Sequence, residues 1–288
     1  MIVTLENSSF TARVNTFGAE LCSLCRKQDG AELVWQGDAR YWSGHAPTLF
    51  PVTGKLRDLR FTHKGRSYEM PPHGFAKDSP FTVEQQSDRE LTLCLTSSEQ
   101  TLQCYPFPFR FLCTFTLTEQ GLRLTRRVEN TGSEEMFFSM GEHLGLALAP
   151  DTPSLDQCEL TFPTPQTACN WRLDGGLLKE RQAFLDNASS LALSKKLFRE
   201  YGCLVLQGLN APWITLRCGG RDWARVSAQG FPTVVVWSPD NAGAFVCVEP
   251  WQGLPSDSAA GYELARRPCI LRLAPGRAYA YTLYLEAL

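Results

Sequence analysis

Alternation of apolar and polar residues is the dominant pattern along this 288-residue chain. In the segment FRFLCTFTL (109–117) apolar residues occupy every second position, which is the period of a strand with one buried face. The alternation resumes at Leu122 and Leu124 after the loop TEQG (118–121). The two segments therefore predict a β-hairpin with a short loop that contains glycine.

Strand signals recur through the chain, whereas helical spacing is scarce. The segment 279–288 alternates in the same way, and 233–237 (TVVVW) is a short apolar strand. Helical periodicity is best within 193–201, where leucines and a tyrosine recur at spacing four and predict one or two turns. Strands that follow one another without helices between them indicate an all-β fold, a large antiparallel β-sandwich with little helix. Because no repeat or linker divides the chain, we expect one domain over residues 1–288.

Composition narrows the classes of partner. With 43% hydrophobic and 20% charged residues the chain can bury a large core, and its net charge of −2 gives no electrostatic reason to expect nucleic acid or an anionic membrane surface. The first residues, MIVTLENSSFTARV (1–14), lack the pattern of a secretion signal, and no apolar run is long enough to span a bilayer. We expect a cytoplasmic protein, monomeric or homodimeric, that binds a small molecule.

The 11 cysteines are an odd number and are scattered singly through strand-like segments. This distribution is typical of reduced, buried thiols that pack as small apolar groups. Cys22 and Cys25 form the one closely spaced pair, but no second pair of cysteines or histidines completes a zinc motif. The pair is therefore interpreted as structural, and no metal site is predicted.

One of the four histidines lies in the proline-bounded segment MPPHGFAKDSPF (70–81). Two prolines fix their own φ angles just before His73, and Gly74 permits a sharp turn or a close backbone approach directly after it. His73 is thus held in a stiff frame. A histidine in a loop is more often a structural hydrogen-bonding residue than a functional one, so the frame alone does not assign a role.

Two further polar residues stand near predicted strand ends. His143 ends the segment MFFSMGEH (136–143), and alternation alone leaves it as either a structural or a functional residue. Glu249 shares a strand face with Phe245 and Cys247. A carboxylate on an apolar face is costly to bury, so Glu249 either reaches solvent at the strand end or belongs to a polar site.

Four segments together resemble the aldose 1-epimerase (galactose mutarotase) family, and in particular its branch of shorter proteins similar to LacX. They are HAPTLFPVTGKL (45–56), PPHGFAKDSPF (71–81), MGEH (140–143) and VEPWQGLPSD (248–257). The resemblance covers nearly the whole chain. It implies a large antiparallel β-sandwich that binds the sugar on a concave face, in agreement with the alternation.

The resemblance also implies roles for individual residues. Glu249 corresponds to the family's base, His143 to its acid, and His73 to the histidine that binds and polarises the ring oxygen. Further residues are expected near the sugar: Lys55, Arg57, Phe75, Lys77, Trp237 and Trp251.

These residue types suit the interconversion of sugar anomers. The reaction removes the proton of the C1 hydroxyl and protonates the ring oxygen, so one base and one acid suffice, without metal or organic cofactor. We expect Glu249 to be ionised and His143 protonated, giving a bell-shaped pH dependence with the glutamate on the acid limb and the histidine on the basic limb.

Three departures bear on the choice of sugar. Lys77 stands where the branch often has arginine, Leu144 follows the middle histidine in place of proline, and the segment 201–207 lacks the family's sugar-binding aspartate. One alternative is a hexose-6-phosphate 1-epimerase with a cationic patch on Lys55, Arg57, Arg60 and Lys77. Another is a non-catalytic carbohydrate-binding protein, although mere binding does not require an acid and a base. A glycosidase would need a second opposed carboxylate besides Glu249.

Overall fold

The structure, a computed structural model, describes residues 1–152, 154–239 and 244–288. Within these ranges the largest sheet has 15 antiparallel strands. In pairing order they are β5 (Thr48–Leu49), β13 (Met140–Glu142), β21 (Phe245–Gln252), β20 (Thr233–Trp237), β17 (Cys203–Gln207), β15 (Cys158–Asp174), β18 (Trp213–Cys218), β19 (Arg221–Ser227), β23 (Ala278–Ala287), β11 (Gly121–Asn130), β10 (Phe109–Leu117), β9 (Glu90–Thr96) and β8 (Thr82–Gln86), with β14 (Leu144–Ala147) on β21 and β16 (Leu177–Ala192) on β15.

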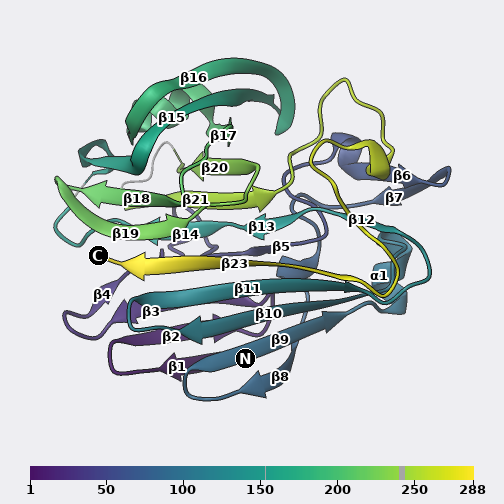
Figure 1. Ribbon diagram of the computed structural model, residues 1–288, viewed down its shortest axis with the longest axis horizontal. Helices are drawn as coiled ribbons and strands as arrows, with labels where there is room; N and C mark the ends of the chain where they lie inside the picture. The colour runs from purple at the N-terminus through teal and green to yellow at the C-terminus, as the bar shows by residue number, and fades with distance from the viewer. Residues whose placement is uncertain (153, 240–243) are drawn as a thin grey trace.

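The large sheet bends back on itself. Its path climbs from β8 at the bottom of Figure 1 to β15 and β16 at the top, and then returns through β17, β20 and β21 toward the middle of the molecule. The curvature gives the sheet a concave side, as expected for the predicted sandwich. The all-β, antiparallel fold class read from the alternation is thus confirmed.

Smaller elements complete the fold. A four-stranded sheet contains β1 (Ile2–Glu6), β2 (Phe10–Asn15), β3 (Glu20–Arg26) and β4 (Ala31–Glu32), and two strand pairs are formed by β6 (Arg60–His63) with β7 (Arg66–Glu69) and by β12 (Met136–Phe138) with β22 (Leu271–Leu273). The helices are short: α1 (Glu99–Cys104), α2 (Lys195–Tyr201) and the 3-10 turns η1 (Arg57–Leu59), η2 (Ala76–Asp78), η3 (Leu155–Gln157) and η4 (Leu264–Arg266).

The individual elements follow the sequence pattern closely. Residues of β10 alternate strictly between buried and half-buried positions, and β10 pairs with β11 in the predicted hairpin. Since β11 begins at Gly121, the loop is one residue shorter than the predicted 118–121. The apolar segment 233–237 forms β20, and the alternating C-terminal segment forms β23. The helical spacing within 193–201 corresponds to α2. Its N-cap, Ser194, accepts a hydrogen bond from the backbone N–H of Leu197.

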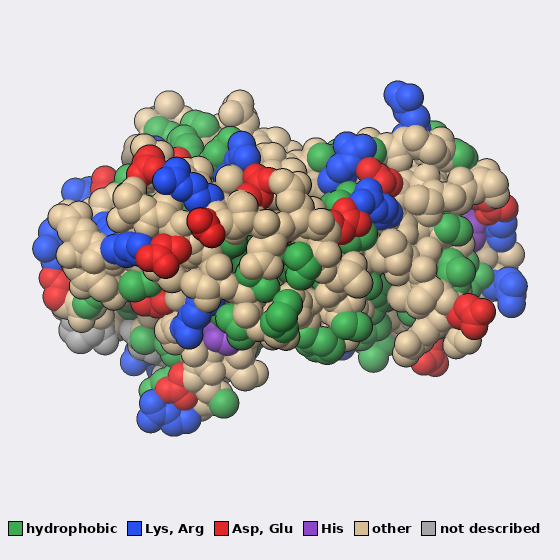
Figure 2. All heavy atoms as spheres, turned by 90° about the horizontal axis from the view of Figure 1, so that it is seen from below, with side chains coloured by type: hydrophobic (Ala, Val, Ile, Leu, Met, Phe, Trp, Pro, Cys, Tyr) green, Lys and Arg blue, Asp and Glu red, His purple; other side chains and the backbone are tan. Residues whose placement is uncertain are grey.

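The core lies between the two sheets, where β3 contacts β11. It is rich in aromatic rings, with Phe50 packed against Phe109 and Phe111 at centroid distances of 5.0 and 4.7 Å. Burying such rings supplies much of the hydrophobic stabilisation. The charged surface is mixed. Figure 2 shows lysine and arginine side chains interspersed with aspartate and glutamate, in keeping with the small net charge.

A buried ion pair joins three strands of the large sheet. Arg126 on β11 and Glu142 on β13 are each 1% exposed, and Arg126 Nη2 donates to Glu142 Oε2 at 2.9 Å. Tyr281 on β23 donates its hydroxyl to Glu142 Oε1 at 2.8 Å, and the guanidinium lies 4.7 Å from the Phe115 ring centroid. Each charge has thus left water and depends on its partners in the protein.

No helix in the described ranges is long and apolar enough to cross a membrane.

We predict that Glu142→Gln lowers the free energy of unfolding by about 3 to 5 kcal/mol, because it leaves the Arg126 guanidinium buried without a counter-charge. Urea unfolding measures the loss. The matched control is Glu129→Gln, which removes partly exposed ion pairs with Arg127 and Arg110 and should cost less than about 1 kcal/mol per pair. Equal losses of unfolding free energy in the two variants would show that the buried ion pair is no more important for stability than an exposed one.

Candidate functional site

His73 is held by the turn that follows its two prolines. Its φ angle is 65°, in the left-handed region, and Gly74 follows with φ 75°. A Cβ at Gly74 would lie 2.2 Å from the Phe50 carbonyl oxygen, so no other residue fits there without moving the backbone. The same oxygen accepts the backbone N–H groups of Phe75 and Ala76. The segment is therefore tied to the aromatic core, and His73 projects from a fixed backbone.

Hydrogen bonds also fix the ring of His73. Its backbone N–H donates to the Gly54 carbonyl at 2.9 Å, and Gly54 N–H donates to His73 Nδ1 at 3.3 Å. A neutral imidazole that accepts at Nδ1 carries its proton on Nε2. His73 thus presents an N–H donor through Nε2, which suits a ring oxygen or hydroxyl of a ligand.

His143 and Glu249 come together from neighbouring strands. His143 stands between β13 and β14, both of which pair with β21, the strand that carries Glu249. His143 Nδ1 lies 3.5 Å from Glu249 Oε1, about half an ångström beyond a normal hydrogen bond. The histidine side chain is 14% exposed and the glutamate side chain 1% exposed. A bound molecule that tightens the contact would let a proton pass between the two groups.

Aromatic rings surround the two histidines. Trp42 stacks on His143 at a centroid distance of 4.8 Å, and Trp237 meets the same ring edge-on at 5.8 Å. The ring centroid of His73 lies 5.5 Å from the ring centroid of His143 and also 5.5 Å from that of Trp251. The rings restrict the orientation of the imidazoles and exclude water from their faces.

The three residues line one cavity of about 250 Å³, here called the Glu249 cavity. Its lining residues are Gly54, Lys55, Pro72, His73, His143, Leu173, Gly176, Cys203, Val205, Val235, Trp237, Glu249, Trp251 and Pro255. Most of this wall is apolar, with a few polar groups that converge on one side. That combination is typical of small-molecule sites.

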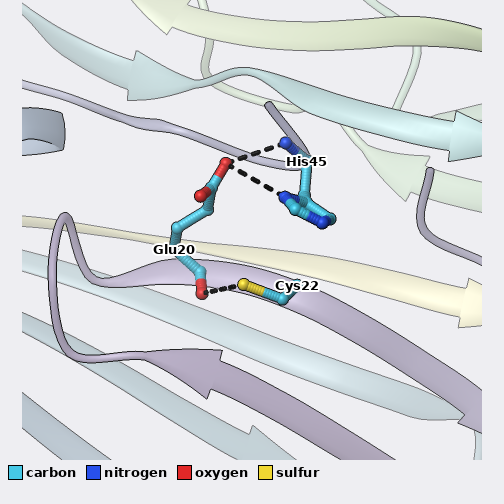
Figure 3. Close-up of side chains that lie close together, drawn as sticks. All are labelled: Glu20, Cys22 and His45. Atoms are coloured by element: carbon cyan, nitrogen blue, oxygen red, sulfur yellow. Dashed lines mark hydrogen bonds and ion pairs between the residues drawn. The ribbon is translucent and has the colours of Figure 1, made fainter. Parts of the chain in front are cut away.

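A second cavity of about 400 Å³, the Glu20 cavity, shares His73 and His143 with the first. Figure 3 shows the Glu20 carboxylate against His45, whose backbone N–H donates to it at 2.8 Å, while the Cys22 thiol points at the Glu20 carbonyl. Burial would raise the pKa of Glu20, but the hydrogen bonds from His45 hold it below its usual value. A carboxylate is therefore fixed on the outer side of the histidines.

Burial reverses the protonation pattern expected from the sequence. It raises the pKa of Glu249 well above its usual range and lowers the pKa of His143 to about 3 and that of His73 to about 4. Burial thus favours the uncharged forms of both groups, a protonated Glu249 and an unprotonated His143, over the charged forms. The histidines therefore govern the acid limb of a pH profile and the glutamate the basic limb, opposite to the sequence-based expectation.

The structure brings most of the other predicted residues to these cavities. Lys55, Trp237 and Trp251 line the Glu249 cavity, where Lys55 Nζ donates to the Gly175 carbonyl at 2.8 Å. Lys77 lines the Glu20 cavity and is paired with Asp78. The two lysines therefore flank the histidines from different sides.

Phe75 and Arg57 lie elsewhere. Phe75 packs its ring against Phe50, Tyr105 and Phe109 in the core, and it is not part of either cavity lining. Arg57 donates to the Ala260 carbonyl at 2.9 Å, and its guanidinium covers a tyrosine ring. Both residues are adjacent to site segments in sequence, but neither lines one of the two described cavities.

Sequence reasoning missed several lining residues. Trp42 and Glu20 belong to segments far from the recognised histidines, and only the fold places them there. Cys203 and Val205 lie on β17, in the segment where the expected aspartate is missing, and they give the cavity an apolar wall at that point. Alternation along 203–207 places Cys203 and Val205 on one strand face, and this pattern in the sequence could have identified them as a pair.

Two groups in the described ranges offer possible metal ligands within 4.8 Å of one another: Glu20 with Cys22 and His45, and His143 with Cys247 and Glu249. Zinc prefers a deprotonated thiolate. Burial raises the pKa of Cys22 to about 11 and that of Cys247 well above its usual range, so each thiol would have to release a proton to bind zinc. The structural interpretation of Cys22 and Cys25 stays a prediction.

Comparisons with known proteins place this geometry in a family. The family model described as aldose 1-epimerase matches residues 1–283. The plasmid-encoded protein LacX of Lactococcus lactis subsp. lactis is 29% identical over 96% of this chain and 95% of its own length. A galactose mutarotase-related enzyme of Lactobacillus acidophilus has a TM-score of 0.94 at 27% identity, covering 100% of this chain and 97% of that one. A galactose mutarotase-like protein of Lactobacillus casei has a TM-score of 0.92 at 29% identity, with both chains fully covered.

We predict that His73 and His143 stay neutral in the folded protein down to about pH 4, as measured by ¹H–¹⁵N NMR of the imidazole nitrogens. In urea the same two rings should titrate near the ordinary value for an exposed histidine, about 6.5. Between about pH 6.5 and pH 4 the unfolded chain then binds more protons than the folded protein. The free energy of unfolding should therefore fall as the pH drops through this range. Titration of both rings near 6.5 in the native state would contradict the burial argument.

Proposed function

The chain belongs to the aldose 1-epimerase family, and on this premise we propose that it interconverts the α and β anomers of a free hexose by opening and reclosing the sugar ring. The observation that carries the proposal is the convergence of His73, His143 and Glu249 on one cavity, although they are far apart in sequence. A carbohydrate-binding protein without activity would have no need of a carboxyl and an imidazole 3.5 Å apart.

The pair of His143 and Glu249 would act as a unit that holds one exchangeable proton. Glu249 passes its proton to His143 Nδ1, and His143 gives the proton of Nε2 to the ring oxygen. At the same time the carboxylate takes the proton of the C1 hydroxyl. The C1–O5 bond breaks, and an aldehyde forms at C1. Rotation about the C1–C2 bond and reversal of the proton transfers close the ring on the other face.

The remaining residues would bind the sugar and position it. The Nε2–H of His73 can donate to the ring oxygen, and its fixed backbone places that donor before the sugar arrives. Trp237 and Trp251 can pack against the C–H faces of a hexose, and the apolar wall formed by Cys203 and Val205 continues this surface. Exclusion of water strengthens the electrostatic interactions of the buried acid and base.

The distribution of cations favours a free sugar over a sugar phosphate. Lys55 and Lys77 line different cavities, and each has a partner within the protein. Arg57 and Arg60 both lie over the ring of Tyr262, at 4.8 and 4.4 Å from its centroid. A phosphate site requires several donors aimed at one point, and these four side chains are instead dispersed.

We predict that the protein accelerates the mutarotation of freshly dissolved α-hexoses, followed by polarimetry, and acts more slowly on the corresponding 6-phosphates. The assay contains EDTA and a thiol reductant, because the proposed proton transfers use side chains alone. No acceleration with any free hexose would refute the proposal. Faster reaction with the phosphates would favour the hexose-6-phosphate 1-epimerase, and activity restored only by added metal would overturn the cofactor-free mechanism.

We predict that Glu249→Gln lowers kcat/KM by about a hundredfold to ten-thousandfold, since the amide keeps the size of the side chain but cannot accept the C1 proton. The basic limb of the pH profile should vanish in this variant, because Glu249 governs that limb. Isothermal titration should still detect the sugar, as the cavity keeps its shape. The matched control is Glu159→Gln on β15, which should retain the parent rate. Parent activity in Glu249→Gln would show that another group takes the proton.

A further inference from the structure

Two cysteines face each other where β15 begins and β18 ends, and neither lines the Glu249 cavity. Cys158 is the first residue of β15 and Cys218 is the last residue of β18, and the two are directly paired across these antiparallel strands. Their Sγ atoms are 3.0 Å apart, and the residues are 4% and 1% exposed. Across the described ranges, this is the pair of cysteines whose sulfurs are in direct contact.

The backbone already holds the two residues in positions that a disulfide can bridge. Residues directly opposite each other in an antiparallel pair have Cβ atoms roughly 4.5 to 5.5 Å apart, and disulfides accept Cβ separations of about 3.5 to 4.5 Å. The sulfurs need to approach by only about 1 Å to reach bonding distance. Small rotations and a slight closing of the strand pair therefore suffice.

A cavity large enough for a small oxidant adjoins one of the two cysteines. Cys218 lines a cavity of about 430 Å³ together with Asp151, Arg221 and Trp223. Cys158 is not part of that lining. The hydrogen bond with Cys158 lowers the pKa of the Cys218 thiol, and a backbone N–H of Ala149 adds to the effect. Cys218 is thus the cysteine next to the cavity and the one assigned the first reaction with an oxidant.

We propose that Cys158 and Cys218 are a modification site, a thiol pair that forms a reversible disulfide when the protein meets a peroxide. The proposal does not depend on the proposed sugar chemistry, because it rests on the pairing of two strands.

The reaction proceeds in two balanced steps. The Cys218 thiolate attacks one oxygen of hydrogen peroxide, the O–O bond breaks, and a proton is taken up, giving a sulfenic acid and water. The Cys158 sulfur, having lost its proton, then attacks the sulfenic sulfur, and the hydroxyl leaves as a second water. In total two thiols lose two electrons and two protons, and one peroxide becomes two molecules of water.

The new bond would close a covalent loop over residues 158–218. This segment supplies Leu173, Cys203 and Val205 to the Glu249 cavity. A disulfide at its two ends limits the freedom of the segment in the unfolded chain. Oxidation would therefore raise the stability of the fold without adding a group to the cavity.

The test treats the native, fully reduced protein with a small molar excess of hydrogen peroxide and then blocks free thiols with an alkylating reagent. The expected result is an intact mass lower by two hydrogens, about 2 Da, before alkylation, and a non-reduced peptide map that links Cys158 to Cys218. Dithiothreitol should restore two alkylatable thiols. A map in which both cysteines stay alkylated, or in which either is linked to another cysteine, would overturn the proposal.

Variants separate the roles of the two sulfurs. In Cys158→Ser the sulfenic acid on Cys218 should persist and be trapped by dimedone, whereas Cys218→Ser should give no trapped adduct on Cys158. Cys269→Ser is the matched control, since it removes the exposed cysteine and should leave the linkage intact. Dimedone labelling of Cys158 in place of Cys218 would refute the proposed order of attack. The map of the unsubstituted protein decides the linkage even if a serine variant fails to fold.

Discussion

The candidate site depends on the buried ion pair between Arg126 and Glu142. Glu142 is fixed by Arg126 and Tyr281 from two other strands of the large sheet, and it immediately precedes His143 in the chain. Its backbone carbonyl accepts the indole N–H of Trp251 at 3.2 Å. One carboxylate in the core therefore fixes the backbone next to His143 and the orientation of the Trp251 ring. A buried pair of this kind contributes little net stability but strongly penalises alternative arrangements.

The strand that carries Glu249 places an ionisable carboxyl group in a buried setting. All eight residues of β21 are buried, and Glu249 pairs directly with Val235 on the neighbouring strand. A carboxyl group in this setting is more stable when it holds a proton than when it is charged. The proposed reaction requires that same proton to move, and the nearby imidazole of His143 would accept it.

Much of the fold could be predicted from the sequence because alternation directly encodes which face of a strand is buried. The segment 109–117 and the C-terminal strand illustrate this, and parity also placed Glu249 on an apolar face. The frame around His73 was readable from its prolines and glycine. Phe75 could not be placed in the same way, because a loop has no fixed period and its ring turns toward the core. Trp42 could not be found either, since its contact with His143 depends on the return of a distant segment.

The close contact between Gly74 and the Phe50 carbonyl distinguishes two parts of the site. One part tolerates substitution, and the other does not. Any side chain at this position would collide with the Phe50 carbonyl, so the loop bearing His73 cannot be reshaped without displacing the aromatic core. Side chains on β17 are different, because Cys203 and Val205 project from a strand whose backbone is held by hydrogen bonds on both sides. Exchanges there alter the cavity wall and leave its frame in place. A laboratory library meant to reshape the cavity is therefore better placed on the strand wall than on the loop that carries His73.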